Sequence, residues 1–450
     1  MPDYSSLPSV TALASIPELE RFPEAIRTRA AQNSISAVRE GIKEGEPIDV
    51  NAMAIFEAMK MKIGEYRRIH NLSGVILHTG LGRAPLPAVV QAGYSNLEFS
   101  LDTGKRGDRQ DHVRSLLCEL TGAEDALVVN NGAGAVLLAL SALCTKKEVL
   151  LSRGQSVEIG GAFRMPDVIK ASGCKLVDVG TTNKTKAQDY SEAITSKTAA
   201  ILQCHPSNFE VKGFTSSPTT QELADVAHKN GLLFINDQGN GALIDFKKYG
   251  IHEIETLPQS VASGADITIG SGDKLLGGPQ CGIILGRKDL IAKMAKHPLA
   301  RALRIDKTNL MALTTTLRNY SFKSFEEIPM FRCLNYSADT IKDWCETISP
   351  NGAEILESVT EIGSGAAPGQ GVKSFSVVMG SKKPDALLAS LRQCGLIGRI
   401  YKGKVWLDPR TAEELFGLGT GIPVELEQEP RTFFTDHMKS MISDCWEQWK

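Results

Sequence analysis

The stretch Ile267-Thr-Ile-Gly-Ser-Gly-Asp-Lys-Leu-Leu-Gly-Gly-Pro-Gln-Cys-Gly-Ile-Ile-Leu285 says most about the fold of this 450-residue chain. An apolar strand ends in the polar turn Ser271–Lys274, Gly-Gly-Pro follows, and a second apolar strand begins. Burial between two strands lowers the pKa of a lysine, and the free amine can then form a Schiff base. The Ser271 hydroxyl can face a phosphate in the same turn. The alternative for this segment is a surface hairpin with a solvated lysine.

Short apolar runs continue on the N-terminal side of this stretch and alternate with helical stretches such as Val136–Leu143 and Thr220–Asn230. The runs, with the two already quoted, are Ala126–Val129, Val149–Leu151, Leu176–Val179, Ala199–Leu202, Leu232–Ile235, Ile267–Ile269 and Gly282–Leu285. Runs of this length that are apolar on both faces are typical of a parallel sheet covered by helices. The alternation therefore predicts one doubly wound α/β domain.

The remaining chain divides around this domain, and we predict a helical N-terminal domain (1–68), a large α/β domain (69–310) and a small α+β domain (311–450). The helix Met311–Tyr320 leads away from the large domain, and a glycine-rich connector, Gly363–Gly371, precedes the small unit. The elements expected beyond the connector are Ser374–Met379, Asp385–Gln393, the hairpin Ile397–Tyr401 with Lys404–Leu407, and a helix near Thr432–Trp449.

Composition and charge exclude several classes of protein. Fifty Lys and Arg against fifty-two Asp and Glu give a formal charge of -2, so nucleic acid must be held by a local patch. No apolar run approaches the ~20 residues of a membrane span, and residues 1–14 do not read as a secretory signal. Nine cysteines stand singly without a Cys-x-x-Cys pair, which predicts neither a disulfide framework nor a metal site. We expect a cytoplasmic protein with no membrane partner.

An aspartate stands where open α/β sheets bind ligands. The run Leu232-Leu-Phe-Ile-Asn-Asp237 puts Asp237 just beyond the carboxyl end of a predicted buried strand. A carboxylate there can pair with a protonated pyridine nitrogen and so keep the ring an electron sink. Because Gly239 and Gly241 follow, Asp237 can alternatively be a turn or capping residue.

A glycine turn between a strand and a helix supplies a candidate phosphate site. In Leu127-Val-Val-Asn-Asn-Gly-Ala-Gly-Ala135 we expect Asn131, Gly132 and Ala133 to turn free N–H groups toward an anion. The full Gly-x-Gly-x-x-Gly pattern and a Walker lysine are absent, so the motif alone is weak. Phosphate turn, Asp237, Ser271 and Lys274 follow in an order that suits pyridoxal 5'-phosphate on an aspartate-aminotransferase-like fold.

The chain resembles the bacterial selenocysteine synthases, the L-seryl-tRNA(Sec) selenium transferases, over nearly all its length and most densely from residue 71 to 304. The motifs that carry the resemblance are Asn71-Leu-Ser-Gly-Val-Ile-Leu-His-Thr-Gly-Leu-Gly-Arg83, Asn96-Leu-Glu-Phe99, Gly104-Lys-Arg-Gly107, Val157-Glu-Ile-Gly-Gly-Ala-Phe-Arg164, Val179-Gly-Thr-Thr-Asn183, Ser271-Gly-Asp-Lys-Leu-Leu-Gly-Gly-Pro-Gln280, His297-Pro-Leu-Ala-Arg-Ala-Leu-Arg304 and Ile397-Gly-Arg-Ile-Tyr401. Eight ordered motifs are far more specific than any one of them.

The resemblance implies a pyridoxal-phosphate enzyme of fold type I, built as a ring of dimers. Such an enzyme converts seryl-tRNA(Sec) to selenocysteyl-tRNA(Sec) with selenophosphate, through a dehydroalanyl-tRNA intermediate. By the same resemblance, Lys274 carries the cofactor and Asp273 is its catalytic neighbour. Arg83, Arg301 and Arg304 receive the anionic selenium donor, which suits guanidinium forks because they bind phosphate with two parallel hydrogen bonds.

Some of these assignments have plain alternatives. Arg301 and Arg304 lie three residues apart, so they share one face if the segment is helical, and that face can instead be solvated or paired with acids. His205 follows the strand Ala199–Leu202 and either contacts the cofactor or is an ordinary turn residue.

The resemblance also makes residues 1–68 the tRNA-binding candidate. Residues 1–70 hold nine Lys and Arg against ten Asp and Glu, so only a local cluster favours RNA. That cluster is Lys60, Lys62, Arg67, Arg68 and His70. It can instead be a solvated helix end that complements the helix dipole.

Two other functions stay open. One is a pyridoxal-phosphate-dependent ammonia-lyase or β-eliminating enzyme acting on a small phosphorylated amino acid or amino sugar acid. The other is a degenerate tRNA-binding or scaffold protein, against which Lys274 and Asp237 weigh strongly.

Overall fold

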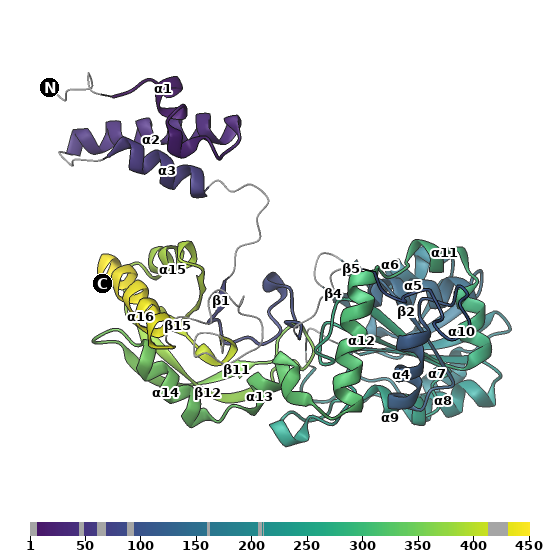
Figure 1. Ribbon diagram of the computed structural model, residues 1–450. Helices are drawn as coiled ribbons and strands as arrows, with labels where there is room; N and C mark the ends of the chain where they lie inside the picture. Colours follow the sequence, from purple (N-terminus) through teal and green to yellow (C-terminus); the bar gives the residue numbers. More distant parts are fainter. Residues whose placement is uncertain are drawn as a thin grey trace. The chain divides into compact units, whose positions relative to one another are not determined.

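The computed structural model describes residues 7–44, 49–60, 69–87, 94–159, 163–205, 209, 211–412 and 431–450 (Figure 1). The chain divides into two compact units, Met1–Arg68 and Ile69–Lys450, called here the helical unit and the larger unit. The helical unit contains α1 (Val10–Ala14), α2 (Glu24–Glu44) and α3 (Val50–Lys60). Its predicted helical character is confirmed over the described residues.

Small side chains form the centre of the helical unit. Ala30 and Ala31 of α2 and Ala54 and Ala58 of α3 are fully buried, so these two helices pack closely. Residues 61–68, the end of the predicted helical domain, lie outside the described residues.

A seven-stranded sheet forms the centre of the larger unit, and each of its strands coincides with one of the seven predicted apolar runs. The strands are β2 (Asp125–Val129), β3 (Glu148–Ser152), β6 (Lys175–Val179), β7 (Thr198–Cys204), β8 (Leu233–Gly239), β9 (Ile267–Ser271) and β10 (Gly282–Gly286). Their order across the sheet is β2-β10-β9-β8-β7-β3-β6. The sheet is mixed, because β10 runs antiparallel to both β2 and β9.

The prediction of an entirely parallel sheet is therefore wrong at one strand. Residues 272–281 join β9 directly to β10, and a parallel neighbour would need a crossover of about a dozen residues or more. The short connection makes β9 and β10 a hairpin, with Lys274 in its turn.

Helices cover both faces of this sheet, as the doubly wound prediction requires (Figure 1). Leu127 and Val129 face one core, while Ala126 and Val128 face the other, so alternate residues of β2 are buried on opposite sides. The first core is covered by α5 (Gly132–Leu143), α6 (Met165–Ala171) and α10 (Lys288–Ala295). The opposite face carries α4 (Asp111–Thr121), α7 (Ala187–Ala193), α8 (Thr220–Lys229), α9 (Leu257–Ala262) and α12 (Lys307–Ser321).

A second, four-stranded sheet lies in the C-terminal part of the larger unit (Figure 1). Its order is β11 (Glu354–Glu361), β12 (Gly371–Met379), β15 (Lys404–Leu407) and β14 (Arg399–Tyr401). The helices of this part are α13 (Pro329–Asn335), α14 (Ala338–Ile348), α15 (Pro384–Gln393) and α16 (Arg431–Trp449). The predicted strand, hairpin and helices are confirmed.

We predicted that the glycine-rich segment 363–371 precedes this sheet. It lies within the sheet instead, where it joins β11 to β12. The apolar residues of β11 are few, which is why the sequence did not reveal that strand. The proposed boundary at 310/311 falls within α12, which packs against α4. The three-part division stays a prediction.

Arg410 is the largest fully buried side chain of the described residues. Its Nη1 donates to the Cys333 and Tyr336 carbonyls at 2.9 and 2.7 Å, and its Nη2 donates to the Lys373 carbonyl. The neighbouring Asp408 carboxylate, also buried, accepts the Arg410 amide. Arg410 therefore ties the end of α13 to β12.

Replacement of Arg410 by Met should destabilise this part by about 3 kcal/mol, because one buried and two partly buried carbonyls lose their donor. The urea midpoint of tryptophan fluorescence measures this, since all four tryptophans lie at positions 344, 406, 446 and 449. The exposed Arg392→Met is the control and should change stability by less than about 0.5 kcal/mol. Equal midpoints for the two variants would contradict the assignment.

Candidate active site

Polar side chains gather at the carboxyl edge of the large sheet. Ser271 ends β9, Asp237 lies near the end of β8, His205 follows β7, and Asn131 lies two residues beyond β2. These strands run in one direction, so their carboxyl ends meet where open α/β sheets bind ligands. Lys274 reaches the same edge from the β9–β10 turn.

Lys274 is buried, with 6% of its surface exposed, so the surface-hairpin alternative is wrong. Burial lowers the pKa of its amine, and Arg83 acts in the same direction, against the attraction of Asp237 and Asp273. A Cβ placed on Gly239 would lie 4.0 Å from the Lys274 Nζ, which puts the amine over the end of β8. The amine therefore loses its proton more readily than the amine of a solvated lysine.

Asp237 is a strand residue rather than a turn or capping residue. Desolvation raises the pKa of its carboxyl to about 6, while Lys274, Cys204 and the Gly239 amide pull the other way. The Cys204 Sγ lies 3.8 Å from the Asp237 Oδ2, on the neighbouring strand at the same register. Burial keeps the pKa of that thiol well above its usual range, so it stays a hydrogen-bond donor.

The turn after β2 forms an N–H cradle at the start of α5. Asn131 caps the helix, and its Oδ1 accepts the Gly134 amide at 2.7 Å. The amides of Gly132 and Ala133 stand at the first helical positions, where no intrahelical acceptor exists. A Cβ on Gly132 would lie 2.9 Å from the Ser271 Oγ, so this hydroxyl faces the cradle and a larger residue would crowd it.

His205 adds a buried nitrogen to the same edge. Its amide donates to the Asp237 carbonyl at 3.0 Å, and its Nδ1 is buried without a hydrogen-bond partner among the described residues. Burial and the nearby Lys274 lower the pKa of the ring, which keeps the imidazole neutral. These groups fit pyridoxal phosphate. The N–H cradle suits its phosphate and the carboxylate suits its ring nitrogen. The amine suits its aldehyde and the imidazole suits its ring.

Arg83 reaches this site within the same chain. Its Nη1 donates to the Asp273 Oδ2 at 2.7 Å, and the Ala84 amide donates to the Asp273 carbonyl. Arg83 has a φ of 66°, a left-handed conformation that a non-glycine residue adopts at some cost. Arg83 therefore lies beside Asp273 and Lys274. In the sequence, only the family resemblance predicted Arg83 at this site.

Arg301 and Arg304 do not share the partner of Arg83. Arg301 is exposed on α11 (Pro298–Ala302), and Arg304 donates to the Glu98 Oε1 at 2.6 Å. The backbone of this segment lies beside the cradle, because the Asn130 amide donates to the Leu303 carbonyl. The acid-paired alternative thus holds for Arg304, while its place next to the cradle agrees with an anion site.

Sequence reasoning missed four residues that the structure brings to these sites: Glu98, Arg106, Arg109 and Cys204. Two of them stand within the quoted motifs 96–99 and 104–107, which were the available signal. Cys204 stands at the end of an apolar strand, where a cysteine reads as an ordinary core residue.

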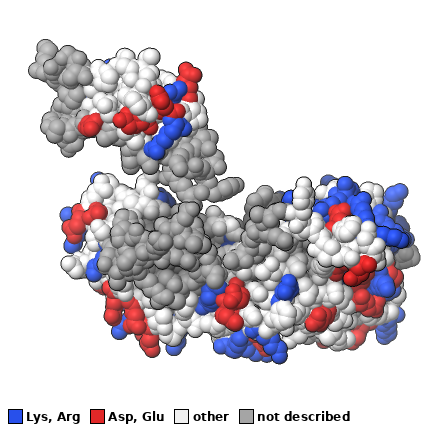
Figure 2. Space-filling model, in the orientation of Figure 1, with Lys and Arg blue, Asp and Glu red and all other residues white. Residues whose placement is uncertain are grey.

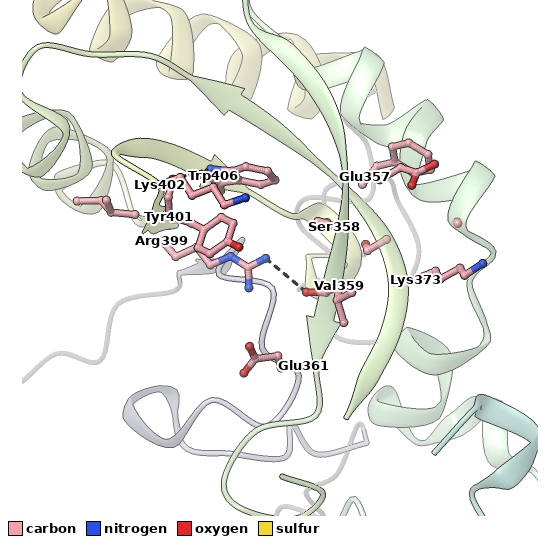
Figure 3. Close-up of a pocket in the computed structure, with 13 residues that line it drawn as sticks. Glu357, Ser358, Val359, Glu361, Lys373, Arg399, Tyr401, Lys402 and Trp406 are labelled. Carbon is pink, nitrogen blue, oxygen red and sulfur yellow. Dashed lines mark hydrogen bonds between the residues drawn. The ribbon is translucent and has the colours of Figure 1, made fainter. Parts of the chain in front are cut away.

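A hollow of about 730 Å³, which the sequence analysis does not predict, opens on the four-stranded sheet (Figure 3). Arg399, Tyr401 and Trp406 line one side, and Glu357 and Lys373 line the other. The Arg399 Nη2 donates to the Val359 carbonyl at 3.4 Å. This hollow holds both charge signs and no group matching the pyridoxal phosphate chemistry of the sheet edge.

The mixed seven-stranded sheet with a buried lysine in its hairpin defines an α/β enzyme of the pyridoxal-phosphate-dependent, aspartate-aminotransferase-like class. The chain belongs to the SelA family, L-seryl-tRNA selenium transferase, which it matches over residues 69–413.

Curated relatives agree with this family. The chain is 42% identical to the L-seryl-tRNA(Sec) selenium transferase of Carboxydothermus hydrogenoformans, over 91% of this chain and 94% of that protein. It is 41% identical to the enzyme of the same name from Hyphomonas neptunium, with the same coverage.

A solved structure confirms the fold. The structure of a D-glucosaminate-6-phosphate ammonia-lyase matches with a TM-score of 0.57 at 20% identity, covering 85% of this chain and 96% of that one. At this identity the likeness shows the predicted fold class and nothing about the reaction.

The raised pKa of Asp237 predicts a pH dependence of stability in the cofactor-free protein. An unfolded aspartate loses its proton near pH 3.8, whereas folded Asp237 keeps it up to about pH 6. The folded state therefore binds more protons in this window, and its free energy of unfolding falls as pH rises through it. Asp237→Asn should flatten the fall, measured as the urea midpoint at several pH values.

The exposed Asp245 is the control, because the Lys247 amide lowers the pKa of its carboxyl below the window. Asp245→Asn should leave the slope above pH 3.8 unchanged. Identical slopes for wild type and Asp237→Asn would show that the Asp237 carboxyl is ionised throughout.

Proposed function

We propose that this chain converts L-seryl-tRNA(Sec) to L-selenocysteyl-tRNA(Sec), with selenophosphate as the selenium donor and pyridoxal phosphate held on Lys274. The observation that carries the proposal is the buried Lys274 between Asp237 and the Arg83–Asp273 pair, in a chain of the SelA family. A scaffold protein would have no reason to bury an amine beside two carboxylates, since burial of charge costs free energy.

Lys274 would hold the cofactor through its aldehyde, and its amine would move the proton of the serine α-carbon. Its lowered pKa favours the neutral amine, which is the form that attacks an aldehyde and accepts a proton. When bound, pyridoxal phosphate withdraws electrons from the carbon beside the serine amine. Asp237 would hold the ring nitrogen, and the Cys204 thiol donates to the Oδ2 of that carboxylate.

The phosphate of the cofactor is received by the amides of Gly132 and Ala133 and by the Ser271 hydroxyl. Asn131 keeps these amides in place through its bond to Gly134. The neutral ring of His205, whose buried Nδ1 has no partner among the described residues, is our candidate for contact with the cofactor ring.

The selenium donor is an anion, and we assign it to Arg83, Arg301 and Arg304. Arg83 lies at the Lys274 turn, so it can bring an anion to the reacting carbon. Arg301 is exposed and forms no ion pair with the described residues, so its guanidinium is available to a ligand.

The helical unit is our candidate for tRNA binding. Acidic and basic side chains are mixed on the visible face of the helical unit, so no single-sign surface attracts RNA there (Figure 2). Binding must therefore rest on shape or on a small patch. Three residues of the predicted patch, at 62, 67 and 68, lie outside the described residues.

We also propose a homo-oligomer, based on dimers and built as a ring, that acts in the cytoplasm. Exposed apolar side chains support a covered face beside the arginines: Tyr94, Phe99 and Leu101 are 103%, 50% and 75% exposed. None of the described helices has the length and apolar character of a membrane span.

Replacement of Lys274 by Ala should abolish the visible absorbance of bound cofactor and lower turnover by at least about a thousandfold, because both binding and proton transfer are lost. Absorbance spectra and single-turnover rates measure the two effects. Lys170→Ala, on the exposed side of α6, is the control. A Lys274→Ala protein with an unchanged spectrum would refute the assignment.

The full chain should form selenocysteyl-tRNA from seryl-tRNA(Sec) and selenophosphate about a hundredfold faster than from charged tRNA(Ser). A chain that begins at residue 69 should lose this turnover and keep its cofactor spectrum, if the helical unit binds tRNA. Release of ammonia from a phosphorylated amino sugar acid, with or without residues 1–68, would instead favour the ammonia-lyase.

A further inference from the structure

Three arginines converge on the Glu98 carboxylate, and we call Glu98, Arg106, Arg109 and Arg304 the Glu98 cluster. Arg106 donates through Nη2 and Nε to the Glu98 Oε2 at 2.7 and 3.2 Å. The Arg109 Nε lies 2.9 Å and the Arg304 Nη2 2.6 Å from the Glu98 Oε1. The Arg106 hydrogen bond is the main cause of the lowered pKa of Glu98, so the carboxyl is ionised.

The backbone fixes these side chains from two distant segments. Phe99 and Arg106 form an antiparallel bridge, and the Gly107 amide donates to the Glu98 carbonyl, so residues 98–107 make a hairpin. Arg304 forms an antiparallel bridge with Val129 at the end of β2. The Arg109 Nη1 also donates to the Ile305 carbonyl at 2.9 Å, which ties the start of α4 to the same segment.

The charge balance of the cluster is unusual for this molecule. One carboxylate faces three guanidinium groups. Desolvation, then Arg109 and then Arg301 lower the pKa of Arg304, so Arg301 lies near enough to act on it. Arg114 shows the opposite balance, since one guanidinium there meets the carboxylates of Asp108, Asp111 and Asp125. A structural ion pair neutralises itself, whereas the Glu98 cluster keeps an excess of positive charge.

The cluster also adjoins the cradle. The bridge between Val129 and Arg304 and the bond from the Asn130 amide to the Leu303 carbonyl put its backbone next to Asn131, which caps α5. Excess cation next to an anion-binding helix start favours an anionic ligand with several oxygens.

We propose that Glu98 is a positioning residue for the anionic selenium donor: it holds Arg304 and Arg109 with their forks set toward a phosphate-type dianion, and leaves Arg301 free to close on it. Arg106 serves as the outer anchor of Glu98. This inference rests on the proposed function for the name of the donor, and its chemistry is that of any tetrahedral dianion.

The physical advantage is preorganisation. A free arginine loses rotamer freedom when it binds an anion, and Glu98 imposes that loss beforehand on two of them. Because the carboxylate is outnumbered, it orders the forks without cancelling their field.

The test compares Glu98→Gln with wild type in the cofactor-loaded protein, where the cradle is already filled. Glutamine keeps the size and one acceptor oxygen but loses the charge that orders two guanidiniums. We expect the KM for selenophosphate to rise about tenfold or more, with kcat within about threefold and the KM for seryl-tRNA unchanged. The Kd of inorganic phosphate, measured by calorimetry, should rise by a similar factor, and the cofactor spectrum should not change.

Asp289→Asn is the matched control, since Asp289 forms a similar two-bond pair with Arg287 on the exposed surface. It should leave both the KM and the phosphate Kd unchanged. If Glu98→Gln does not fold, Glu98→Asp keeps the charge but is one methylene too short to reach both Arg106 and Arg304. It should raise the phosphate Kd at least about threefold.

Unchanged phosphate Kd and KM in Glu98→Gln would overturn the proposal, and so would tighter phosphate binding, which would make Glu98 a competitor of the anion. The phosphate measurement does not depend on the tRNA reaction. A wild-type protein without seryl-tRNA(Sec) turnover would therefore disprove the proposed function, while weaker phosphate binding by Glu98→Gln would still support the cluster.

Discussion

The Lys274 amine sits in a turn whose two flanking strands, β9 and β10, are both interior to the seven-stranded sheet. A short connection between two buried strands leaves no room for the side chain to reach bulk water. The ammonium charge must then be balanced by Asp237 and Asp273, or the amine must lose its proton. Burial favours loss of the proton. The sheet order and the antiparallel β10 keep this amine away from water. The position of Asp237 on β8 keeps it near a carboxylate.

The cations around the sheet edge fall into two groups that act differently. Arg83 is paired one-to-one with Asp273, which holds it at the Lys274 turn. Arg304 shares Glu98 with two other arginines, and that group retains positive charge. An anion that approaches the edge therefore meets guanidinium groups that are already ordered and that outnumber their carboxylate, while Arg83 stands beside the amine.

Short apolar runs located all seven strands of the large sheet, because a strand buried on both faces leaves a continuous signature. They did not show the direction of β10, which depends on the length of the connection between two strands rather than on their composition. Lys274, Asp237 and the turn at Asn131 were found because each stands at a strand end. Glu98 was not, since its partner Arg304 lies 206 residues away and no local pattern links two such charges.

The segment 69–87 is anchored at both ends within the larger unit. At its start, His70 and Asn71 pair with β13 (Leu396–Ile397), and Val75 bridges to Glu361 of β11. At its end, Arg83 grips Asp273 beside Lys274. The segment thus links the edge of the four-stranded sheet to the Lys274 turn through fewer than twenty residues of chain, and it ends in a cation that, after burial, contributes to the lowered pKa of Lys274.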